Sequence, residues 1–192
     1  MSAQLVLVTA AALVGYVAGA VSPATLVASR RGVDLRGVGS GNPGAANVGR
    51  ALGRRTGVVV ALLDVLKGLV PAAGFGVADH RAGLVAGFAA VIGHVSSPFL
   101  RGRGGKGVAT AAGAVLGSHP LWAPVVIGVW VLVLVARRWI ALASIASAVS
   151  LPLVAVVAGE DVVWALGLAT VLVVRHRPNL VRRLALRREK PP

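Results

Sequence analysis

Residues 58–78 read VVVALLDVLKGLVPAAGFGVA, an apolar run long enough to cross a lipid bilayer as one helix. Its only charged residues are Asp64 and Lys67, whose spacing places them on one face of a helix, where they can neutralise each other. A lone charge at this depth would cost about 3 kcal/mol or more. The run therefore predicts a transmembrane helix with an internal ion pair, which is either a structural brace or part of a functional site.

Six further apolar runs accompany this one along the chain. They occupy residues 5–28, 83–95, 107–117, 121–136, 139–158 and 162–174. Hydrophobic residues make up 56% of the chain and charged residues 14%, whereas soluble domains have about 25% charged residues. We therefore expect one all-α integral membrane domain over residues 1–192, with about seven transmembrane helices, of which some are short.

The basic residues predict the orientation of this bundle. If the helices alternate in direction, one side of the membrane receives residues 30–56, 97–106 and 137–138 and the tail from residue 175. These segments contain 18 of the 20 Lys and Arg residues, so the positive-inside rule places them in the cytoplasm and the amino terminus outside. Because the start, MSAQ, contains no basic residue, we expect the first run to be a mature helix rather than a signal peptide.

Composition also excludes several classes of site. The chain has no cysteine, so it can form no disulfide, no thiolate metal site and no acyl-cysteine intermediate. Its four histidines are scattered and acidic residues are few, so we expect no metal centre. The chain has a net charge of +14, and its basic residues lie between the apolar spans. This placement favours contact with anionic membrane lipids over binding of nucleic acid.

Three polar stretches fall on the predicted cytoplasmic side. They are GSGNPGAANVGR (39–50), RGRGGKGVAT (101–110) and RHRPNLVRRL (175–184). Glycine allows the backbone to approach a ligand closely, and successive exposed N–H groups form a concavity that binds anions. Lys106 and Gly107 open an apolar segment, so the positive end of that helix would face the same anion. The pattern favours cytoplasmic Gly-rich loops that bind phosphate.

The same stretches also fit interpretations that involve no ligand. Gly and Asn also build ordinary turns, and the third stretch also fits a plain helix end, where basic residues and Pro are common. A nucleotide is not implied, because a Walker loop requires Ser or Thr after its lysine and Gly107 follows Lys106. HxxxxD, HExxH and GxSxG patterns are absent from the sequence.

Together the motifs GSGNPGAANVGR, GGKGVAT and HRPNLVRRL resemble, in this order, those of the acyl-phosphate-dependent glycerol-3-phosphate acyltransferases, the PlsY family of bacterial membrane enzymes. The segments DVLKG and GHVSSPF between them strengthen the resemblance. It implies seven helices in the bacterial inner membrane and transfer of a fatty acyl group from acyl phosphate to glycerol 3-phosphate. The products would be lysophosphatidate and phosphate, in the first step of phospholipid synthesis. It implies no metal or CoA, and we expect no cofactor and a functional monomer.

The resemblance also implies roles for individual residues. Those expected to take part in the chemistry are Lys106, His176, Ser40 and Asn42. Those expected to bind the phosphates and the acceptor are Gly41, Asn47, Arg50, Gly104, Gly105, Gly107, Ser144, Arg177 and Asn179. Arg177 would clamp the acceptor phosphate, and Lys106 would hold the acyl phosphate. The sequence departs from the family at Ala46 and Ala141, where Thr and Ser are usual, so those hydroxyls are not expected to be indispensable.

We expect the acceptor hydroxyl to attack the acyl phosphate directly, because its phosphate leaves readily and the chain has no elbow serine or cysteine. The proton acceptor is either His176 or a phosphate oxygen of a substrate. The alternative function is a membrane carrier or channel for a phosphorylated solute, since broken helices and buried charges also build transporter sites. The enzyme is favoured because the polar stretches lie on one side and the two halves of the chain differ.

Overall fold

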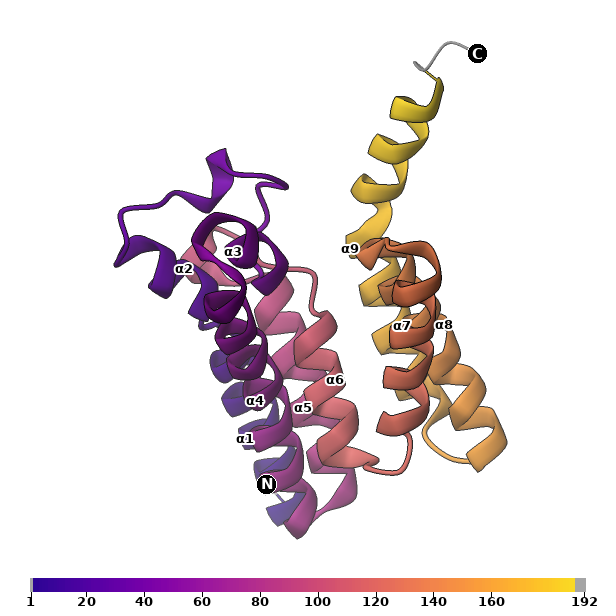
Figure 1. The fold of residues 1–192 in the computed structure, drawn as a ribbon. Coiled ribbons are helices and arrows are strands. Elements are labelled where there is room, and N and C mark those ends of the chain that lie inside the picture. The colour runs from indigo at the N-terminus through magenta and orange to yellow at the C-terminus, as the bar shows by residue number, and fades with distance from the viewer. Residues whose placement is uncertain (1, 189–192) are drawn as a thin grey trace. The chain divides into compact units, whose positions relative to one another are not determined.

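The computed structural model describes residues 2–188, and all regular secondary structure in that part of the chain is helical. The chain divides into two compact units, Met1–Leu121 and Trp122–Pro192 (Figure 1). The predicted all-α class is confirmed. A single domain over the whole chain stays a prediction.

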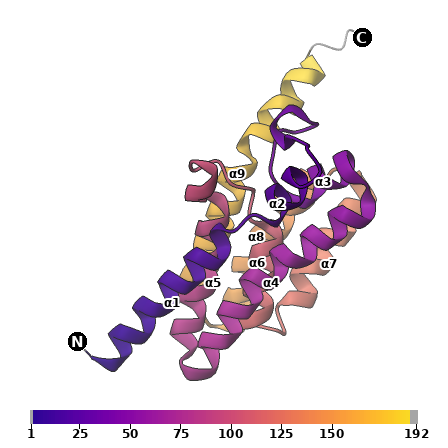
Figure 2. The same cartoon turned by 90° about the vertical axis from the view of Figure 1, so that its left-hand side faces the viewer.

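The first unit contains six α-helices and two short 3-10 helices among its described residues. In chain order they are α1 (Ala3–Ala20), α2 (Pro23–Ser29), η1 (Leu35–Gly37), α3 (Ala45–Leu52), α4 (Arg54–Ala78), α5 (His80–Val95), η2 (Pro98–Leu100) and α6 (Val108–Ser118). Helix α5 packs against α1, α4 and α6, and α4 also packs against α6 (Figure 2).

Glycines allow these apolar helices to pack at close range. At Gly15 and Gly19 of α1, a Cβ atom would overlap backbone atoms of Ala86 and Ala90 in α5. Helix α4 meets α6 in the same way, because a Cβ at Gly68 would overlap the backbone of Thr110. Small residues at helix contacts are typical of membrane proteins, where van der Waals packing rather than the hydrophobic effect holds helices together.

From Val58 onward, the outward-facing side chains of α4 are apolar, as expected of a helix in contact with lipid. Val70 and Val77 are 63% and 91% exposed. Among the residues that the structure describes, four helical stretches are long and apolar enough to cross a membrane, namely Ala3–Ser29, Arg54–Ala78, His80–Leu100 and Ile140–Ala158. Val108–Ser118 and Ala123–Arg137 are shorter apolar helices. The membrane class is thus confirmed, while seven crossings stay a prediction.

The first apolar run does not form the single helix expected over residues 5–28. Helix α1 ends at Ala20, Val21 is extended, and α2 begins at Pro23. The Oγ atom of Ser22 accepts a hydrogen bond from the backbone N–H of Thr25, which caps α2. Proline at the first position of a helix has no N–H to leave unsatisfied, so Ser-Pro starts a new helix here. The expectation of one unbroken helix was wrong.

The second unit contains three α-helices within its described residues: α7 (Ala123–Arg137), α8 (Ile140–Ala158) and α9 (Val162–Arg188). Helix α8 packs against both α7 and α9. Figure 1 shows α9 continuing beyond the ends of α7 and α8. Near its carboxyl end, the guanidinium carbon of Arg183 lies 4.2 Å from the ring centroid of Trp139, which precedes α8.

Helix α9 contains the third polar stretch, which was expected to stand at the end of the last helix. The helix continues through Pro178 to Arg188, so that expectation was wrong. Proline removes one hydrogen bond from a helix but does not by itself end it. The residues after Asn179 are mainly Leu, Ala and Arg, which have high helix propensity, and this explains the continuation.

Candidate active site

The first polar stretch folds as a loop followed by a helix, rather than as a loop throughout. Asn47, in the first turn of α3, is 2% exposed. Its Nδ2 donates to the carbonyl oxygens of Leu35 (3.0 Å) and Val38 (2.9 Å), and its Oδ1 accepts from the N–H of Ser40 (3.1 Å). Asn47 therefore fastens the preceding loop to α3.

Arg50 completes this cluster one turn further along α3. Its Nη2 donates to Oδ1 of Asn47 (3.1 Å) and to Oγ of Ser40 (3.2 Å). The amide of Asn47 now makes four hydrogen bonds, which is the full capacity of an Asn side chain. We therefore assign Asn47 to holding the loop instead of the predicted contact with phosphate. Ser40 and Arg50 are exposed, so the cluster presents a hydroxyl and a guanidinium to a ligand.

Two other predicted residues shape the same loop. Gly41 has a φ of +66°, in the left-handed region that glycine adopts at little cost, and its N–H donates to the carbonyl of Val38 (3.0 Å). Asn42 is half-buried, and its carbonyl accepts from the N–H of Gly44 (2.9 Å). Gly41 thus permits the turn that brings Ser40 beside Arg50.

The second polar stretch is fixed to the carboxyl end of α5. The N–H of Gly104 donates to the carbonyl of Val95 (3.2 Å), and that of Gly105 donates to the carbonyl of His94 (3.1 Å). Gly107 has a φ of +85° and stands at the N-cap of α6. As predicted, the half-buried Lys106 stands at the start of this helix, next to its N-cap residue Gly107, where the positive end of the helix favours anions.

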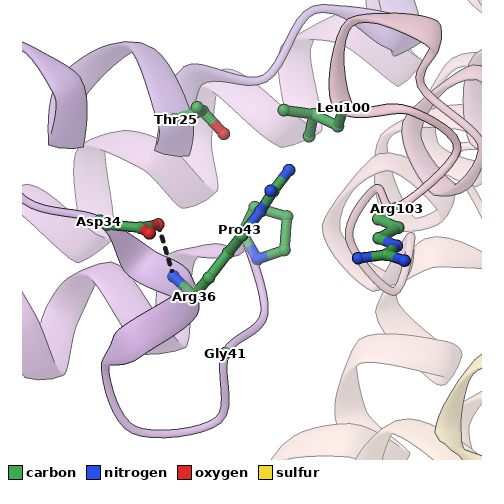
Figure 3. Close-up of a pocket in the computed structure, with 7 residues that line it drawn as sticks. All are labelled: Thr25, Asp34, Arg36, Gly41, Pro43, Leu100 and Arg103. Atoms are coloured by element: carbon green, nitrogen blue, oxygen red, sulfur yellow. Dashed lines mark hydrogen bonds between the residues drawn. The ribbon is translucent and has the colours of Figure 1, made fainter.

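The first and second stretches meet at a pocket within the first unit. Its volume is about 390 Å³, and it is lined by Thr25, Asp34, Arg36, Gly41, Pro43, Leu100 and Arg103 (Figure 3). Gly41 and Pro43 belong to the first stretch and Arg103 to the second. The predicted convergence of these two loops is therefore observed. Arg36 and Arg103 were not among the predicted site residues.

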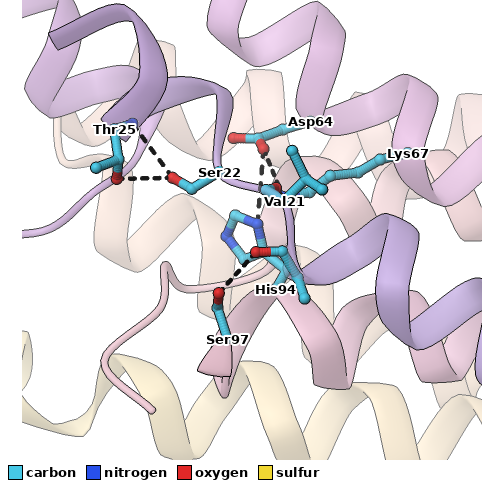
Figure 4. A network of polar contacts seen from close by, with 8 residues as sticks. Val21, Ser22, Thr25, Asp64, Lys67, His94 and Ser97 are labelled. Atoms are coloured by element: carbon cyan, nitrogen blue, oxygen red, sulfur yellow. Dashed lines mark hydrogen bonds and ion pairs between the residues drawn. The ribbon is translucent and has the colours of Figure 1, made fainter. Parts of the chain in front are cut away.

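The predicted ion pair lies in the same unit. Lys67 and Asp64 face each other (Figure 4), with Nζ of Lys67 2.9 Å from Oδ1 of Asp64. Both side chains are less than one-tenth exposed. Lys67 also donates to the carbonyl of Val21 (2.8 Å), in the break between α1 and α2. Nδ1 of His94 is 3.6 Å from the same carboxylate oxygen. Sequence reasoning assigned no role to His94, although the quoted segment GHVSSPF contains it.

The second unit holds the other predicted residues. In α8, Oγ of the buried Ser144 accepts from Nε1 of Trp130 (3.2 Å) and donates to the carbonyl of Ile140 (2.8 Å). In α9, His176 is buried, Arg177 is exposed and Asn179 is half-buried. All three α9 residues lie within one turn of helix on either side of Pro178.

His176 has a defined tautomer in this environment. Its Nδ1 lies 2.8 Å from the carbonyl oxygen of Leu172, one helical turn earlier. A carbonyl oxygen can only accept a hydrogen bond, so Nδ1 carries a proton. In the neutral imidazole this places the lone pair on Nε2, as a general base requires.

Besides His94, two histidines lie outside the three stretches. His80, at the start of α5, and His119, after α6, pack edge to face with ring centroids 5.2 Å apart. Imidazole nitrogens are common zinc ligands, but a structural zinc site takes four ligands. Two imidazoles alone do not meet this requirement, and we assign the pair no part in the candidate site.

Comparison with known proteins identifies the family. A family model described as glycerol-3-phosphate acyltransferase matches residues 9–186, a range that includes all three polar stretches. This chain belongs to the glycerol-3-phosphate acyltransferase family.

Two curated glycerol-3-phosphate acyltransferases illustrate the similarity. The protein from Geotalea daltonii is 39% identical over 190 residues, which cover 95% of this chain and 94% of that protein. The protein from Aquifex aeolicus is 40% identical over 182 residues, which cover 91% and 94% of the two chains.

Crystal structures of PlsY, an integral membrane glycerol 3-phosphate acyltransferase, resemble this chain as well. The glycerol 3-phosphate form has a TM-score of 0.88 and 38% identity, and the lysophosphatidic acid form has a TM-score of 0.85 and 36% identity. Each match covers 94% of this chain and 93% of the other. The comparisons favour the family's enzymatic function over the alternative of a carrier or channel.

Proposed function

We propose that this protein transfers a fatty acyl group from acyl phosphate to glycerol 3-phosphate, forming lysophosphatidate and inorganic phosphate. The observation that supports this most strongly is the family match over residues 9–186. The residues present suit the reaction, because Ser40, Arg50 and Lys106 offer donors for phosphate and the chain has no cysteine to form an acyl-enzyme. We further propose that the enzyme acts as a monomer.

The reaction places separate demands on the site. When the acceptor hydroxyl attacks the carbonyl carbon, a carbon–oxygen bond forms and negative charge grows on the carbonyl oxygen. The bond from that carbon to the phosphate oxygen then breaks, and the phosphate leaves as an anion. In our proposal Lys106 and the N–H groups around Gly107 stabilise both charges. Ser40 and Arg50 hold a phosphate, and Asn42 and Ser144 assist in orienting the substrates.

The third motif supplies the acceptor side of the proposal. Arg177 binds the phosphate of glycerol 3-phosphate, because a guanidinium can form two parallel hydrogen bonds to a phosphate. Asn179 orients the acceptor, and Nε2 of His176 takes the proton of its attacking hydroxyl. The bond from Nδ1 of His176 to the carbonyl of Leu172 supports this assignment, since it leaves Nε2 as the basic nitrogen.

Replacement of His176 tests the proton transfer. His176→Asn keeps a side-chain N–H that can donate to Leu172 but removes the basic nitrogen, and we expect kcat to fall about 100-fold. The measurement is steady-state release of phosphate with both substrates saturating. If His176→Asn retained near-normal kcat, a phosphate oxygen of a substrate would be the proton acceptor instead.

The choice of acyl donor tests one part of the proposed function. Purified protein should use palmitoyl phosphate and not palmitoyl-CoA when each is supplied with glycerol 3-phosphate at equal concentration. The reason is that loops built from glycine and basic residues match the compact phosphate group of an acyl phosphate, which is a mixed anhydride. Lysophosphatidate is followed by chromatography of radiolabelled product. Comparable rates with the two donors would refute the proposed donor.

We place the protein in the bacterial inner membrane with its amino terminus outside and its carboxyl terminus in the cytoplasm. The partition of basic residues supports this orientation. Because the chain has no cysteine, single Cys substitutions at the exposed Ser2 and Ala185 provide unique labels. An impermeant thiol reagent should label Ser2→Cys in intact cells and Ala185→Cys only in inverted vesicles. Labelling of both from the same face would contradict the topology.

A further inference from the structure

The buried ion pair of α4 is connected to the second polar loop through one side chain, His94. Lys67 anchors the pair to the break between α1 and α2 by donating to the carbonyl of Val21 (2.8 Å). Oδ1 of Asp64 forms the ion pair with Nζ of Lys67 at 2.9 Å and lies 3.6 Å from Nδ1 of His94 (Figure 4). One edge of the imidazole ring is therefore oriented by a carboxylate that is itself held in place.

The other edge of the ring faces the loop. An added Cβ at Gly105 would meet Nε2, Cε1 and Cδ2 of His94 before any other atom, so the ring lies directly against the Cα of Gly105. The backbone of His94 also accepts the N–H of Gly105 (3.1 Å), and Val95 accepts that of Gly104. His94 is only 8% exposed, so its ring has little room to move. It thus supports the residue immediately before Lys106.

We propose that His94 is a positioning residue for the acyl phosphate site. Asp64 and Lys67 orient its ring, the ring supports the backbone of Gly105, and that backbone sets the position of Lys106. This inference rests on the role proposed above for Lys106. It gives the membrane-embedded ion pair a function, since the pair acts on the chemistry through His94 without contacting substrate. A displacement of about 1 Å in a reacting group can cost about 100-fold in rate.

The first test replaces His94 and compares it with a second histidine of the same helix. His94→Ala should lower kcat about 100-fold and leave the KM for glycerol 3-phosphate nearly unchanged, because the acceptor phosphate is bound by other residues. His80→Ala, at the opposite end of α5, should keep wild-type kcat. Wild-type kcat in a folded His94→Ala protein would overturn the inference.

A second test uses the contact between the ring and Gly105. Gly105→Ala should abolish most activity, because its methyl group would occupy the position of the His94 ring. Adding His94→Ala to Gly105→Ala should then raise activity about tenfold above that of Gly105→Ala alone, because effects at residues in contact are not additive and removing the ring removes the overlap. Gly104 provides the matched control, because a Cβ there overlaps the backbone carbonyl of His94, which no side-chain deletion removes.

The inference therefore predicts opposite effects of His94→Ala on the two glycine variants. His94→Ala should rescue Gly105→Ala and should not rescue Gly104→Ala. Equal behaviour of the two pairs would overturn the inference, whether both are rescued or neither is. If His94→Ala does not fold, Gly105→Ala alone decides, because wild-type activity in that single variant would show that the ring does not restrict the loop.

Amide hydrogen exchange separates this inference from the proposed function. In His94→Ala, peptides covering residues 101–108 should exchange faster than in the wild type, while those covering residues 38–50 should be unchanged. Unchanged exchange at residues 101–108 would show that His94 does not hold the loop. Faster exchange with wild-type kcat would overturn the catalytic consequence instead, and would count against the role proposed for Lys106.

Discussion

Replacing Lys106 by alanine is expected to lower kcat by roughly 100- to 1,000-fold, the usual cost of removing one donor that stabilises a developing negative charge. The side chain precedes α6, directly after two glycines that are fixed to the end of α5. Because the charge on the carbonyl oxygen and the departing phosphate grows only during the reaction, the loss should appear in kcat more than in KM. Steady-state kinetics with palmitoyl phosphate measure both.

Two further variants make this result specific. Lys106→Arg should not restore turnover, because the planar guanidinium is bulkier than an ammonium. The neighbouring Gly105 and Gly107 indicate that the substrate approaches the backbone closely here, which leaves little room for the larger group. Arg81→Ala removes one exposed positive charge from the opposite end of α5 and should keep wild-type kcat. If Lys106→Ala retained near-normal kcat at saturating donor, the stabilising group would have to be sought in the third motif.

Removing Asp64 alone is expected to lower the free energy of unfolding by about 3–5 kcal/mol, because it leaves the ammonium of Lys67 buried without its partner. Both side chains are less than one-tenth exposed, and Nζ of Lys67 is 2.9 Å from Oδ1 of Asp64. Asp64→Ala and Lys67→Ala should therefore each reduce stability strongly. Thermal unfolding of the purified variants in detergent measures their stability relative to the wild type.

The double variant separates stability from function at this pair. Asp64→Leu combined with Lys67→Met should recover most of the lost stability, because apolar residues of similar size often replace a buried pair at little cost. If His94 is positioned as inferred, that stable variant should still show reduced kcat. A double variant with wild-type stability and wild-type kcat would make the pair purely structural, and one as unstable as Asp64→Ala would contradict the account of the pair.

Most of the fold could be predicted because lipid imposes a simple length and polarity requirement on each helix. Six of the seven apolar runs correspond to one helix each, and the spacing of Asp64 and Lys67 was enough to predict their contact. The positions at which a helix breaks or continues were harder to predict. The Ser22-Pro23 pair splits the first run, while Pro178 leaves α9 intact, so one residue type has opposite outcomes depending on its neighbours.

The motifs of the candidate site could be predicted from the sequence, but the role of each residue in it could not. The glycines and Lys106 could be located from the pattern of a phosphate-binding loop beside a helix. Asn47 looked like a ligand residue in the sequence, yet all its hydrogen-bonding capacity is used by the preceding loop and by Arg50. His94 could not be found from spacing, because its contacts with Asp64 and Gly105 depend on how α5 packs between α4 and the loop.

The stoichiometry of the reaction is the most direct test of the central claim. Purified protein supplied with palmitoyl phosphate and glycerol 3-phosphate should release inorganic phosphate and lysophosphatidate in equal amounts, because one acyl transfer produces one of each. Neither product should form at an appreciable rate when glycerol 3-phosphate is omitted, since the acceptor hydroxyl is the nucleophile. Phosphate release without lysophosphatidate, or equal rates with and without the acceptor, would contradict the proposed acyl transfer.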